Sequence, residues 1–457
     1  MAVLIKNGIC VTPKGEEKLD VLLEDGRITQ LQENILLDDC EVYDAQGCLI
    51  FPGFIDAHTH LDMNNGVMNT ADDFASGTAG AISGGTTTLI DFATQDKGHS
   101  LNEALKLWHS KADGKSSCNY AFHMAITDWN DSTEAELADM SAAGITSFKL
   151  YMAYDALRVT DAQIFEVLTA VNKLHGIVGV HCENGDLVNE LIKSEKSRGH
   201  YSTRFHPVTR PDYVEAEAIA RFCAIGRAAG TPVHIVHLST KLGLEEIRRA
   251  RARGQKIYVE SCPQYFTLDE SKYLMPGVEG TKYVCSPPLR SRIDVDALWQ
   301  ALKQGEINTI STDHCSFNLL GQKDVGKYDF AIIPNGMPGI EHRAEIMLSL
   351  GLHKYGFTAN EMANLLSTNA ARLFGLENKG EIRLGADADI VVWDKNAEHT
   401  ITAEKMHQNV DYTPYEGVQV QGEAKAVFLA GELVCTQGNI LAQNKGKYVE
   451  RGQSEYF

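Results

Sequence analysis

The chain has 457 residues, of which 44% are hydrophobic and 23% are charged, a composition typical of globular proteins. Its formal net charge is −19 and its pI is about 5.3, so it lacks the basic surface that binding to nucleic acid or to an anionic membrane requires. The length exceeds that of one small domain and suits a large barrel with an accessory domain.

The ten cysteines are scattered, and no two of them form a C-x-x-C pair. This pattern predicts buried free thiols in a reducing compartment rather than a disulfide framework. No stretch approaches the ~20 apolar residues of a membrane span. The first residues indicate a short strand and a turn, without the apolar region of a signal peptide. We therefore expect a cytoplasmic protein without membrane contact.

Short strands joined by turns are predicted for the first 51 residues. Asn7-Gly8 and Asp25-Gly26 are two-residue turn signals between β-rich runs, and such pairs are typical of hairpins. The segment is therefore expected to be all-β. Its predicted strands are Val3–Ile5, Ile9–Thr12, Asp20–Leu23 and Arg27–Leu31.

From residue 52 to residue 377, short β-rich runs alternate with longer amphipathic helices. Eight strands separated by helices predict a (β/α)8 TIM barrel. A doubly wound open sheet is the alternative, and it is less favoured because no G-x-G-x-x-G sequence follows the first strand. The predicted strands are Gly53–Ala57, Thr86–Phe92, Tyr120–Ile126, Ser147–Leu150, Val178–His181, Pro232–Leu238, Lys256–Cys262 and Asn308–Thr312.

Strands return after residue 378, with a further turn signal at Ala430-Gly431. We expect residues 1–51 and 378–440 to pair into one small β-sandwich domain beside the barrel domain of residues 52–377. The polar tail, 441–457, is expected to be mobile or to reach a neighbouring subunit. The predicted strands are Ile382–Leu384, Ile390–Trp393, Ala426–Leu429 and Glu432–Val434.

Potential metal ligands stand at the carboxyl ends of several predicted strands, where barrel enzymes carry their chemistry. His58 and His60 end the first strand, and side chains two apart in a strand point to the same side. Two neutral imidazoles that converge on one point can bind a metal ion. Other strand ends carry Lys149, His181, His237 and Asp313. Together these six positions predict a metal-dependent active site.

Other polar residues near these strand ends compete for the same roles. His234 and His237 are three residues apart and should point to opposite faces, so we assign His237 to the site and His234 to the helix layer. His123 is expected to be a hydrogen-bonded core histidine, and His314 either a residue that supports a metal ligand or a structural residue. Asp91 either orients a ligand imidazole or caps a helix.

Lys149 is the unusual member of the set, because a protonated lysine repels a divalent cation. Reaction of its amine with carbon dioxide would give a carbamate, whose two oxygens and negative charge can bridge two metals. The alternatives are a lysine paired with a nearby carboxylate and a Schiff-base lysine. Strand spacing alone favours these alternatives.

The ligands divide naturally between two zinc ions. His58, His60 and Asp313 would hold one ion, and His181 and His237 the other. Two metals about 3.5–4 Å apart can share a hydroxide, and a metal lowers the pKa of its water to around 7. Asp313 could then take the proton of the attacking hydroxide and pass it to the departing nitrogen.

Over nearly its whole length the chain resembles the dihydropyrimidinase/D-hydantoinase family. The members of this family are cyclic amidohydrolases of the amidohydrolase superfamily. Several of the shared motifs are long and specific. They are PGFIDAHTHLD (52–62), SGGTTTLIDF (83–92), SFKLYMAY (147–154), VHCEN (180–184), HIVHLS (234–239), ESCPQY (260–265), CSPPLR (285–290), STDHC (311–315), PNGMPG (334–339) and DYTPYEG (411–417).

This resemblance implies a (β/α)8 barrel with a β-sandwich built from both termini, and a homotetramer, with a homodimer as the alternative. It implies two zinc ions bridged by carbamylated Lys149 and a hydroxide. The implied reaction opens a hydantoin or a dihydropyrimidine to an N-carbamoyl amino acid. Tyr154 matches the tyrosine that stabilises the developing oxyanion, and Ser286 and Asn335 match residues whose main-chain groups hold the ring amide and its carbonyls.

Two further functions remain open at this point. An allantoinase- or dihydroorotase-like activity would use the same metals, although the motifs around CPQY, SPPLR and PNGMPG fit the dihydropyrimidinase branch better. A non-catalytic scaffold of the same fold is disfavoured, because a scaffold has no need for four histidines, a lysine and an aspartate on one rim. The loops at 62–66 and 155–158 are expected to line the pocket for the ring substituent.

Overall fold

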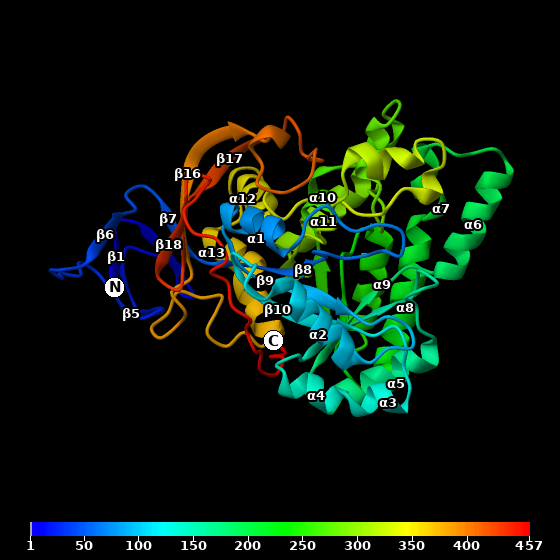
Figure 1. The fold of residues 1–457 in the computed structure, drawn as a ribbon, viewed down its shortest axis with the longest axis horizontal. Coiled ribbons are helices and arrows are strands. Elements are labelled where there is room, and N and C mark those ends of the chain that lie inside the picture. Colours follow the sequence, from blue (N-terminus) through cyan, green and yellow to red (C-terminus); the bar gives the residue numbers. More distant parts are fainter. Residues whose placement is uncertain (1) are drawn as a thin grey trace.

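Eight parallel strands form the central sheet of the computed structural model, which describes residues 2–457 (Figure 1). They pair in chain order, and a parallel bridge between Thr59 and His314 links the end of the sheet back to its beginning. The sheet is thus nearly closed into the predicted (β/α)8 barrel. Its strands are β8 (Phe54–Thr59), β9 (Thr86–Thr94), β10 (Asn119–Ala125), β11 (Ser147–Tyr151), β12 (Ile177–His181), β13 (Val233–Ile235), β14 (Ile257–Ser261) and β15 (Thr309–Ile310).

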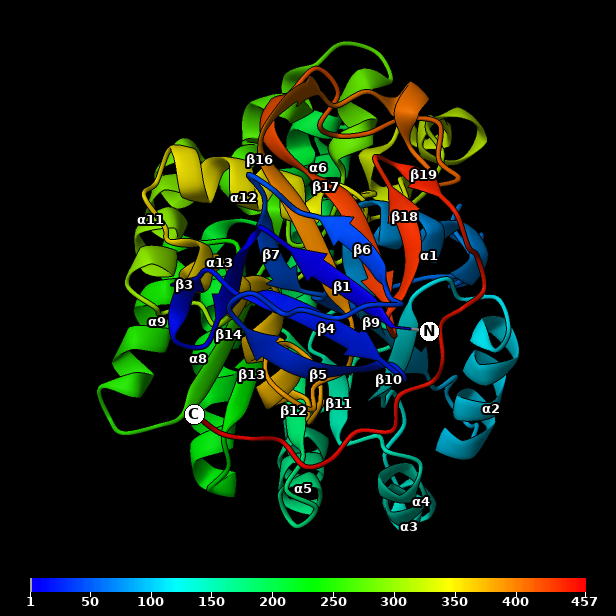
Figure 2. The same cartoon turned by 90° about the vertical axis from the view of Figure 1, so that its left-hand side faces the viewer.

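Helices follow the strands and surround the barrel (Figures 1 and 2). Local sequence explains where several of them begin: Ser100 with Glu103, and Thr160 with Gln163, form capping boxes at the starts of α2 (Leu101–Ala112) and α5 (Asp161–Asn172). The other α-helices are α1 (Phe74–Ser83), α3 (Asp131–Ala135), α4 (Leu137–Ala142), α6 (Gly185–Ser197), α7 (His206–Thr209), α8 (Asp212–Ala229), α9 (Lys241–Arg251), α10 (Pro263–Thr267), α11 (Arg292–Lys303), α12 (Arg343–His353), α13 (Ala359–Ala363) and α14 (Asn369–Leu373). None of the helices described is both long and apolar enough to cross a membrane.

Strands from both ends of the chain form two further sheets beside the barrel (Figure 2). The smaller sheet has the order β5-β4-β1-β6 and the larger one the order β19-β18-β17-β16-β7-β2-β3. Apolar side chains of both termini share one buried cluster, as a sandwich requires. The strands are β1 (Val3–Lys6), β2 (Ile9–Thr12), β3 (Gly15–Glu17), β4 (Asp20–Glu24), β5 (Arg27–Gln32), β6 (Glu41–Asp44), β7 (Leu49–Pro52), β16 (Ile390–Thr400), β17 (Gln419–Leu429), β18 (Glu432–Thr436) and β19 (Asn439–Ile440).

The predicted turns in this region have different outcomes. Asp25-Gly26 and Ala430-Gly431 do join antiparallel neighbours, β4 to β5 and β17 to β18, and both residues of each turn have positive φ. The hairpin expected at Asn7-Gly8 is wrong, because β1 pairs with β4 and β6 whereas β2 pairs with β3 and β7. The chain crosses there from one sheet to the other. A side chain at Gly8 would lie 2.6 Å from Ile50, so this crossing packs closely against β7.

The strand predicted at Ile382–Leu384 is also wrong, since these residues belong to no sheet. Ile382 is buried in the sandwich core, whereas Leu384 is exposed. The apolar pattern that suggested a strand therefore reflects burial of one side chain and not ladder pairing.

The C-terminal tail, residues 441–457, packs along its own barrel, contrary to the expectation of a mobile or outward-reaching segment (Figure 2). Its backbone pairs with β10 through hydrogen bonds on both sides of Tyr120, and the Tyr456 hydroxyl donates to the carbonyl of Gly176 at 2.7 Å. The Arg451 guanidinium is buried, donates to Oγ of Ser147 at 2.7 Å, and also donates to the carbonyl of Phe122. The tail thus covers the amino-terminal ends of strands that carry active-site residues at their other ends.

We expect Arg451→Met to lower the free energy of unfolding by about 1 to 3 kcal/mol, because it leaves buried acceptors without a donor. The midpoint of urea unfolding measures this. Arg249→Met is the matched control, since Arg249 is exposed and, within residues 2–457, pairs only with Glu246 one helical turn away. Equal midpoints for the two variants would contradict a stabilising role for the buried arginine.

Candidate active site

Three of the predicted ligands meet at the carboxyl end of the barrel. His58 lies in β8, His60 follows that strand, and Asp313 follows β15. The Nε2 atoms of His58 and His60 each lie 3.2 Å from Oδ1 of Asp313. His60 also stacks on the ring of Phe92, which belongs to β9. The expectation that the two histidines point to one side agrees with this geometry.

Charges around Asp313 favour its ionised form. Burial disfavours the carboxylate, but the His58 and His60 imidazoles outweigh burial and hold the pKa of Asp313 well below its ordinary value. Burial and Lys149 oppose protonation of His58, yet Glu260 and Asp313 outweigh them and raise its pKa. Asp313 therefore carries a negative charge that faces imidazole nitrogens.

His181 and His237 form a second pair of converging nitrogens on the same rim. His181 ends β12 and His237 follows β13, and Nδ1 of His181 lies 3.0 Å from Nε2 of His237. The ring of His237 is 5.5 Å from that of His58, so the two groups of ligands are neighbours. His237, Asp313 and Tyr154 all have positive φ, a strained conformation that often occurs at functional sites.

Two buried carboxylates that the sequence did not single out hold the histidine rings. Oε1 of Glu260, in β14, lies 2.6 Å from Nδ1 of His58. Oε2 of Glu183 lies 2.8 Å from Nε2 of His181 and accepts a 2.6 Å hydrogen bond from Arg210. Carboxylates in such positions fix the tautomer and orientation of metal-binding imidazoles. A signal existed for Glu183, because it is two residues beyond His181, the spacing that pairs His58 with His60.

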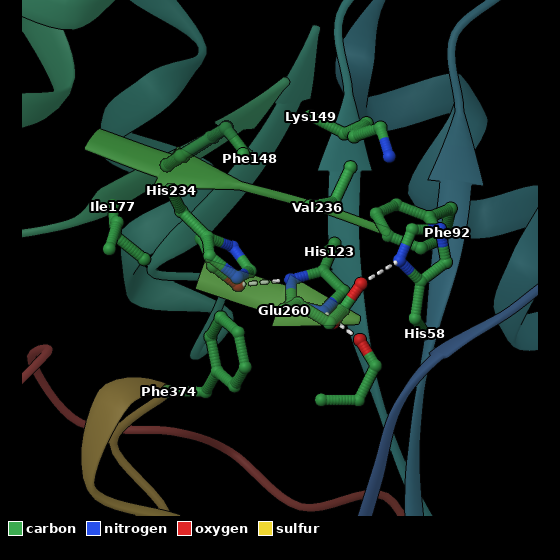
Figure 3. Close-up of a pocket in the computed structure, with 13 residues that line it drawn as sticks. His58, Phe92, His123, Phe148, Lys149, Ile177, His234, Val236, Glu260 and Phe374 are labelled. Carbon is green, nitrogen blue, oxygen red and sulfur yellow. Dashed lines mark hydrogen bonds and ion pairs between the residues drawn. The ribbon is translucent and has the colours of Figure 1, made fainter. Parts of the chain in front are cut away.

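Lys149 is buried in β11, with its Nζ 5.0 Å from the centre of the Phe92 ring (Figure 3). Within residues 2–457, no carboxylate lies within ion-pair distance of this amine, so the alternative of a carboxylate-paired lysine is not what the structure shows. Burial lowers the pKa of Lys149 to about 8, although Asp313 and Glu260 act in the opposite direction. About one tenth of the amine is therefore neutral and nucleophilic at pH 7, a far larger share than for a lysine of ordinary pKa.

The three predicted substrate-binding residues lie around this rim. Tyr154 follows β11, and its ring is 5.2 Å from that of His181. Burial raises the pKa of the Tyr154 hydroxyl to about 12, although the neighbouring Ser286 hydroxyl acts in the opposite direction. The carbonyl of Asn335 accepts a weak hydrogen bond from Sγ of Cys315, in the chain that follows β15. Ser286 and Asn335 thus lie in the loops that follow β14 and β15 in the chain.

His234 does not face the helix layer, so its predicted orientation is wrong. It lines a narrow cavity inside the barrel together with Lys149 and Glu260 (Figure 3). The period-two alternation holds between His234 and Val236, which both line this cavity, but the left-handed backbone of His237 breaks it. Both histidines therefore point inward, at different depths.

His123 and His314 are structural residues, as predicted. Nδ1 of His123 lies 2.5 Å from Oγ of Ser147, and its Nε2 lies 2.9 Å from the carbonyl of Ala57. Nε2 of His314 lies 3.2 Å from Asp72, while Nδ1 accepts hydrogen bonds from two backbone N–H groups of the 339–340 segment. Neither imidazole has a nitrogen directed at Asp313.

Asp91 has neither of the two expected roles. It accepts hydrogen bonds from the Thr59 hydroxyl, from the N–H of Leu61 and from the indole of Trp108, at 2.7–2.9 Å. It binds no ligand imidazole directly, and Ser100 rather than Asp91 caps α2. Asp91 instead holds the two residues that flank His60, through the Thr59 hydroxyl and the Leu61 N–H.

The geometry of His58, His60, Asp313, His181 and His237 suits divalent metal ions. Zinc binds nitrogen and oxygen donors at about 2.0–2.1 Å in a tetrahedral arrangement, which separates two donors by roughly 3.3 Å. The observed separations of 3.0–3.2 Å between donor atoms are close to this value. Nε2 of His58 is buried and makes no hydrogen bond within the part of the chain that is described. His58, His60 and Asp313 form one compact donor group.

Comparison with known proteins agrees with this site. The amidohydrolase family model matches residues 49–434. The chain is 43% identical to the D-hydantoinase of Geobacillus stearothermophilus over 457 residues (99% of this chain, 97% of that protein) and 37% identical to a D-phenylhydantoinase of Escherichia coli over 456 residues (99% and 98%). The structure of dihydropyrimidinase from Brevibacillus agri superposes with a TM-score of 0.98 at 40% identity, covering 99% of both chains. The chain therefore belongs to the amidohydrolase family, in the branch that contains the D-hydantoinases and dihydropyrimidinases.

Proposed function

We propose that this protein is a metal-dependent hydrolase that opens a cyclic ureide, either a hydantoin or a dihydropyrimidine, to an N-carbamoyl amino acid. The observation that carries the proposal is the assembly of His58, His60, His181, His237 and Asp313 on one rim, in a chain 43% identical to a D-hydantoinase. An allantoinase- or dihydroorotase-like activity is not favoured, since the relatives compared are named for hydantoins and dihydropyrimidines.

The residues on the rim would hold two zinc ions. His58, His60 and Asp313 would bind one ion, and His181 and His237 the other. When bound, the ions would activate water as a nucleophile and polarise the attacked carbonyl. Glu260 and Glu183 would keep the imidazoles of His58 and His181 in the orientation that binding requires.

Lys149 would bridge the two ions as a carbamate. Its burial, the absence of an ion-pair partner in residues 2–457 and its lowered pKa all support reaction of the neutral amine with carbon dioxide. The carbamate replaces a repelled ammonium by an anion with two oxygens. It would thereby complete both ligand sets.

Asp313 would move the proton during hydrolysis. Its low pKa keeps the carboxylate ionised, so it can accept the proton of the attacking water at neutral pH. The same carboxyl group would then donate this proton to the ring nitrogen as the C–N bond breaks. Its place beside His58 and His60 keeps it at the nucleophile throughout.

Tyr154, Ser286 and Asn335 would orient the substrate. The pKa of about 12 keeps the Tyr154 hydroxyl protonated, so it can donate a hydrogen bond to the carbonyl oxygen as negative charge develops there. Main-chain groups of Ser286 and Asn335 would bind the amide and carbonyl groups of the ring. These roles place the catalytic unit within residues 52–377, and we propose that the sandwich of residues 1–51 and 378–440 supports it.

We expect purified protein to carry close to two zinc ions per chain and to open dihydrouracil and hydantoin. Plasma emission spectrometry gives the metal content, and the panel also contains allantoin, dihydroorotate and both enantiomers of 5-substituted hydantoins. A preference for the D-enantiomers is expected, because the chain is 43% identical to the D-hydantoinase of Geobacillus stearothermophilus and 26% identical to the L-hydantoinase of Arthrobacter aurescens. Folded protein with metal content near zero, or activity on allantoin or dihydroorotate alone, would contradict the proposal.

We further propose that the protein is a cytoplasmic homotetramer. All ten cysteines are free, which suits a reducing compartment. Leu320, Tyr328 and Ile332 lie on one segment and are 58–78% exposed, as apolar side chains at a subunit interface would be in a single chain. Light scattering coupled to size-exclusion chromatography distinguishes a tetramer from a dimer or a monomer.

A further inference from the structure

Lys323 is completely buried, and its ammonium group has an unusual set of partners. It ends the helical turn Leu319–Lys323, which follows β15 and Asp313. Its Nζ donates to the carbonyl of Val284 at 2.8 Å and to the carbonyl of Pro334 at 3.1 Å. No carboxylate in residues 2–457 lies within ion-pair distance of it. Two main-chain carbonyls are thus its only hydrogen-bond partners in the described chain.

The other buried lysines show how unusual this arrangement is. Lys379 lies 2.8 Å from Asp387 and 2.6 Å from Asp389, so its charge is paired. Lys149 stands among the proposed metal ligands. Burial of an unpaired lysine is costly, and it lowers the pKa of Lys323 to about 7. Because its burial is costly, Lys323 is expected to have a role that a shorter apolar side chain could not fulfil.

The two carbonyls belong to the two loops that the proposed function assigns to the ring of the substrate. Val284 is two residues before Ser286, and Pro334 directly precedes Asn335. The carbonyl of Val284 also accepts the N–H of Gly336 at 3.1 Å, which joins the same two loops beside the lysine. A side chain at Gly336 would clash with Cys315, so this loop is also held close to the chain that follows Asp313.

We infer that Lys323 is a positioning residue that clamps the 284–286 loop to the 334–336 loop and so sets the spacing of the main-chain groups that bind the cyclic substrate. The inference rests on the proposed function, because it takes Ser286 and Asn335 as the substrate contacts. A rigid ring can bond to both loops only when their separation matches its own dimensions. Because the two loops hold the ring in the ground state as well as in the transition state, a change in their separation should raise KM more than it lowers kcat.

The test is Lys323→Met in the full-length, zinc-loaded enzyme, with dihydrouracil and hydantoin as substrates. Methionine fills much of the volume of lysine but donates no hydrogen bond. We expect KM to rise by roughly 10- to 100-fold, kcat to fall by less than about 3-fold, and zinc content to stay unchanged. Lys323→Gln keeps one donor group, and its KM should lie between those of the wild type and Lys323→Met.

Lys303→Met is the matched control, because Lys303 also donates to a backbone carbonyl, that of Gly356, but lies on the surface. It should leave KM, kcat and zinc content unchanged. Unchanged kinetics in Lys323→Met, or a loss of zinc or kcat without a rise in KM, would overturn the inference. Failure of both Lys323 variants to fold would likewise overturn it, since the lysine would then serve the fold alone. Failure of the wild type to open any cyclic ureide would instead refute the proposed function, so the two failures are distinguishable.

Discussion

Lys149→Ala is expected to lose most of its bound zinc and to reduce kcat/KM by more than ~100-fold, since even residues that only support metal ligands change affinity or activity by 10–100-fold. The lysine is buried among His58, Glu260 and His234, so alanine leaves a cavity and removes the proposed bridging anion. Acetate or propionate fits such a cavity and supplies two oxygens. Partial recovery of zinc binding and activity with these acids is therefore expected, measured by metal analysis and steady-state kinetics.

Bicarbonate offers a second measurement on the same residue. Zinc uptake by metal-free wild-type protein should become faster and more complete with bicarbonate, because carbamylation requires carbon dioxide. Uptake by Lys149→Ala should not respond. Lys115→Ala, which changes an exposed lysine that donates to the Ser110 carbonyl, is the control and should behave as the wild type. Full activity and normal zinc content in Lys149→Ala would exclude the bridging role.

Asp313→Asn should lower kcat by about 10²- to 10⁴-fold, the usual contribution of general acid–base catalysis. Asparagine has the same shape but cannot accept the proton of the attacking water. Ligands other than Asp313 are intact in this variant, so at least one zinc ion per chain should remain bound. Substrate affinity should change little, because Ser286 and Asn335 are untouched.

Parallel kinetics and zinc analysis separate the two roles of this carboxylate. Asp296→Asn, at an exposed position of α11, is the matched control and should match the wild type. A kcat within about 3-fold of the wild type for Asp313→Asn would show that another group moves the proton. Complete loss of zinc would show that Asp313 acts mainly as a ligand.

The barrel could be predicted from the sequence because its signal is local. Each buried strand is a short apolar run bounded by helical periodicity, and all eight predicted strands are present. The two wrong predictions in the sandwich domain have the same cause, because a local pattern does not show which strands pair. The chain does bend at Asn7-Gly8, but only tertiary packing decides that β1 and β2 enter different sheets. Ile382 is buried without a ladder partner, which no periodicity reveals.

The metal-site residues could be proposed because they share one end of the barrel. What the sequence could not provide is the direction of side chains where the backbone leaves ideal geometry. The positive φ of His237 brings His234 and His237 to the same interior, against the alternation rule. Glu260 and Arg210 support the site through contacts with residues distant in the sequence, and such contacts follow from the fold alone.

The strand order of the larger sandwich sheet has a consequence for how the protein is made. β7 pairs with β16, yet roughly 340 residues separate Pro52 from Ile390. At 5–20 residues per second of synthesis, β7 waits roughly 20 to 70 s for its partner. During that time the edges of the N-terminal strands are unpaired while the barrel is built between them. An unpaired β edge readily pairs with another chain. We therefore expect nascent chains to aggregate more readily before residue 390 has been synthesised, when many copies are made close together.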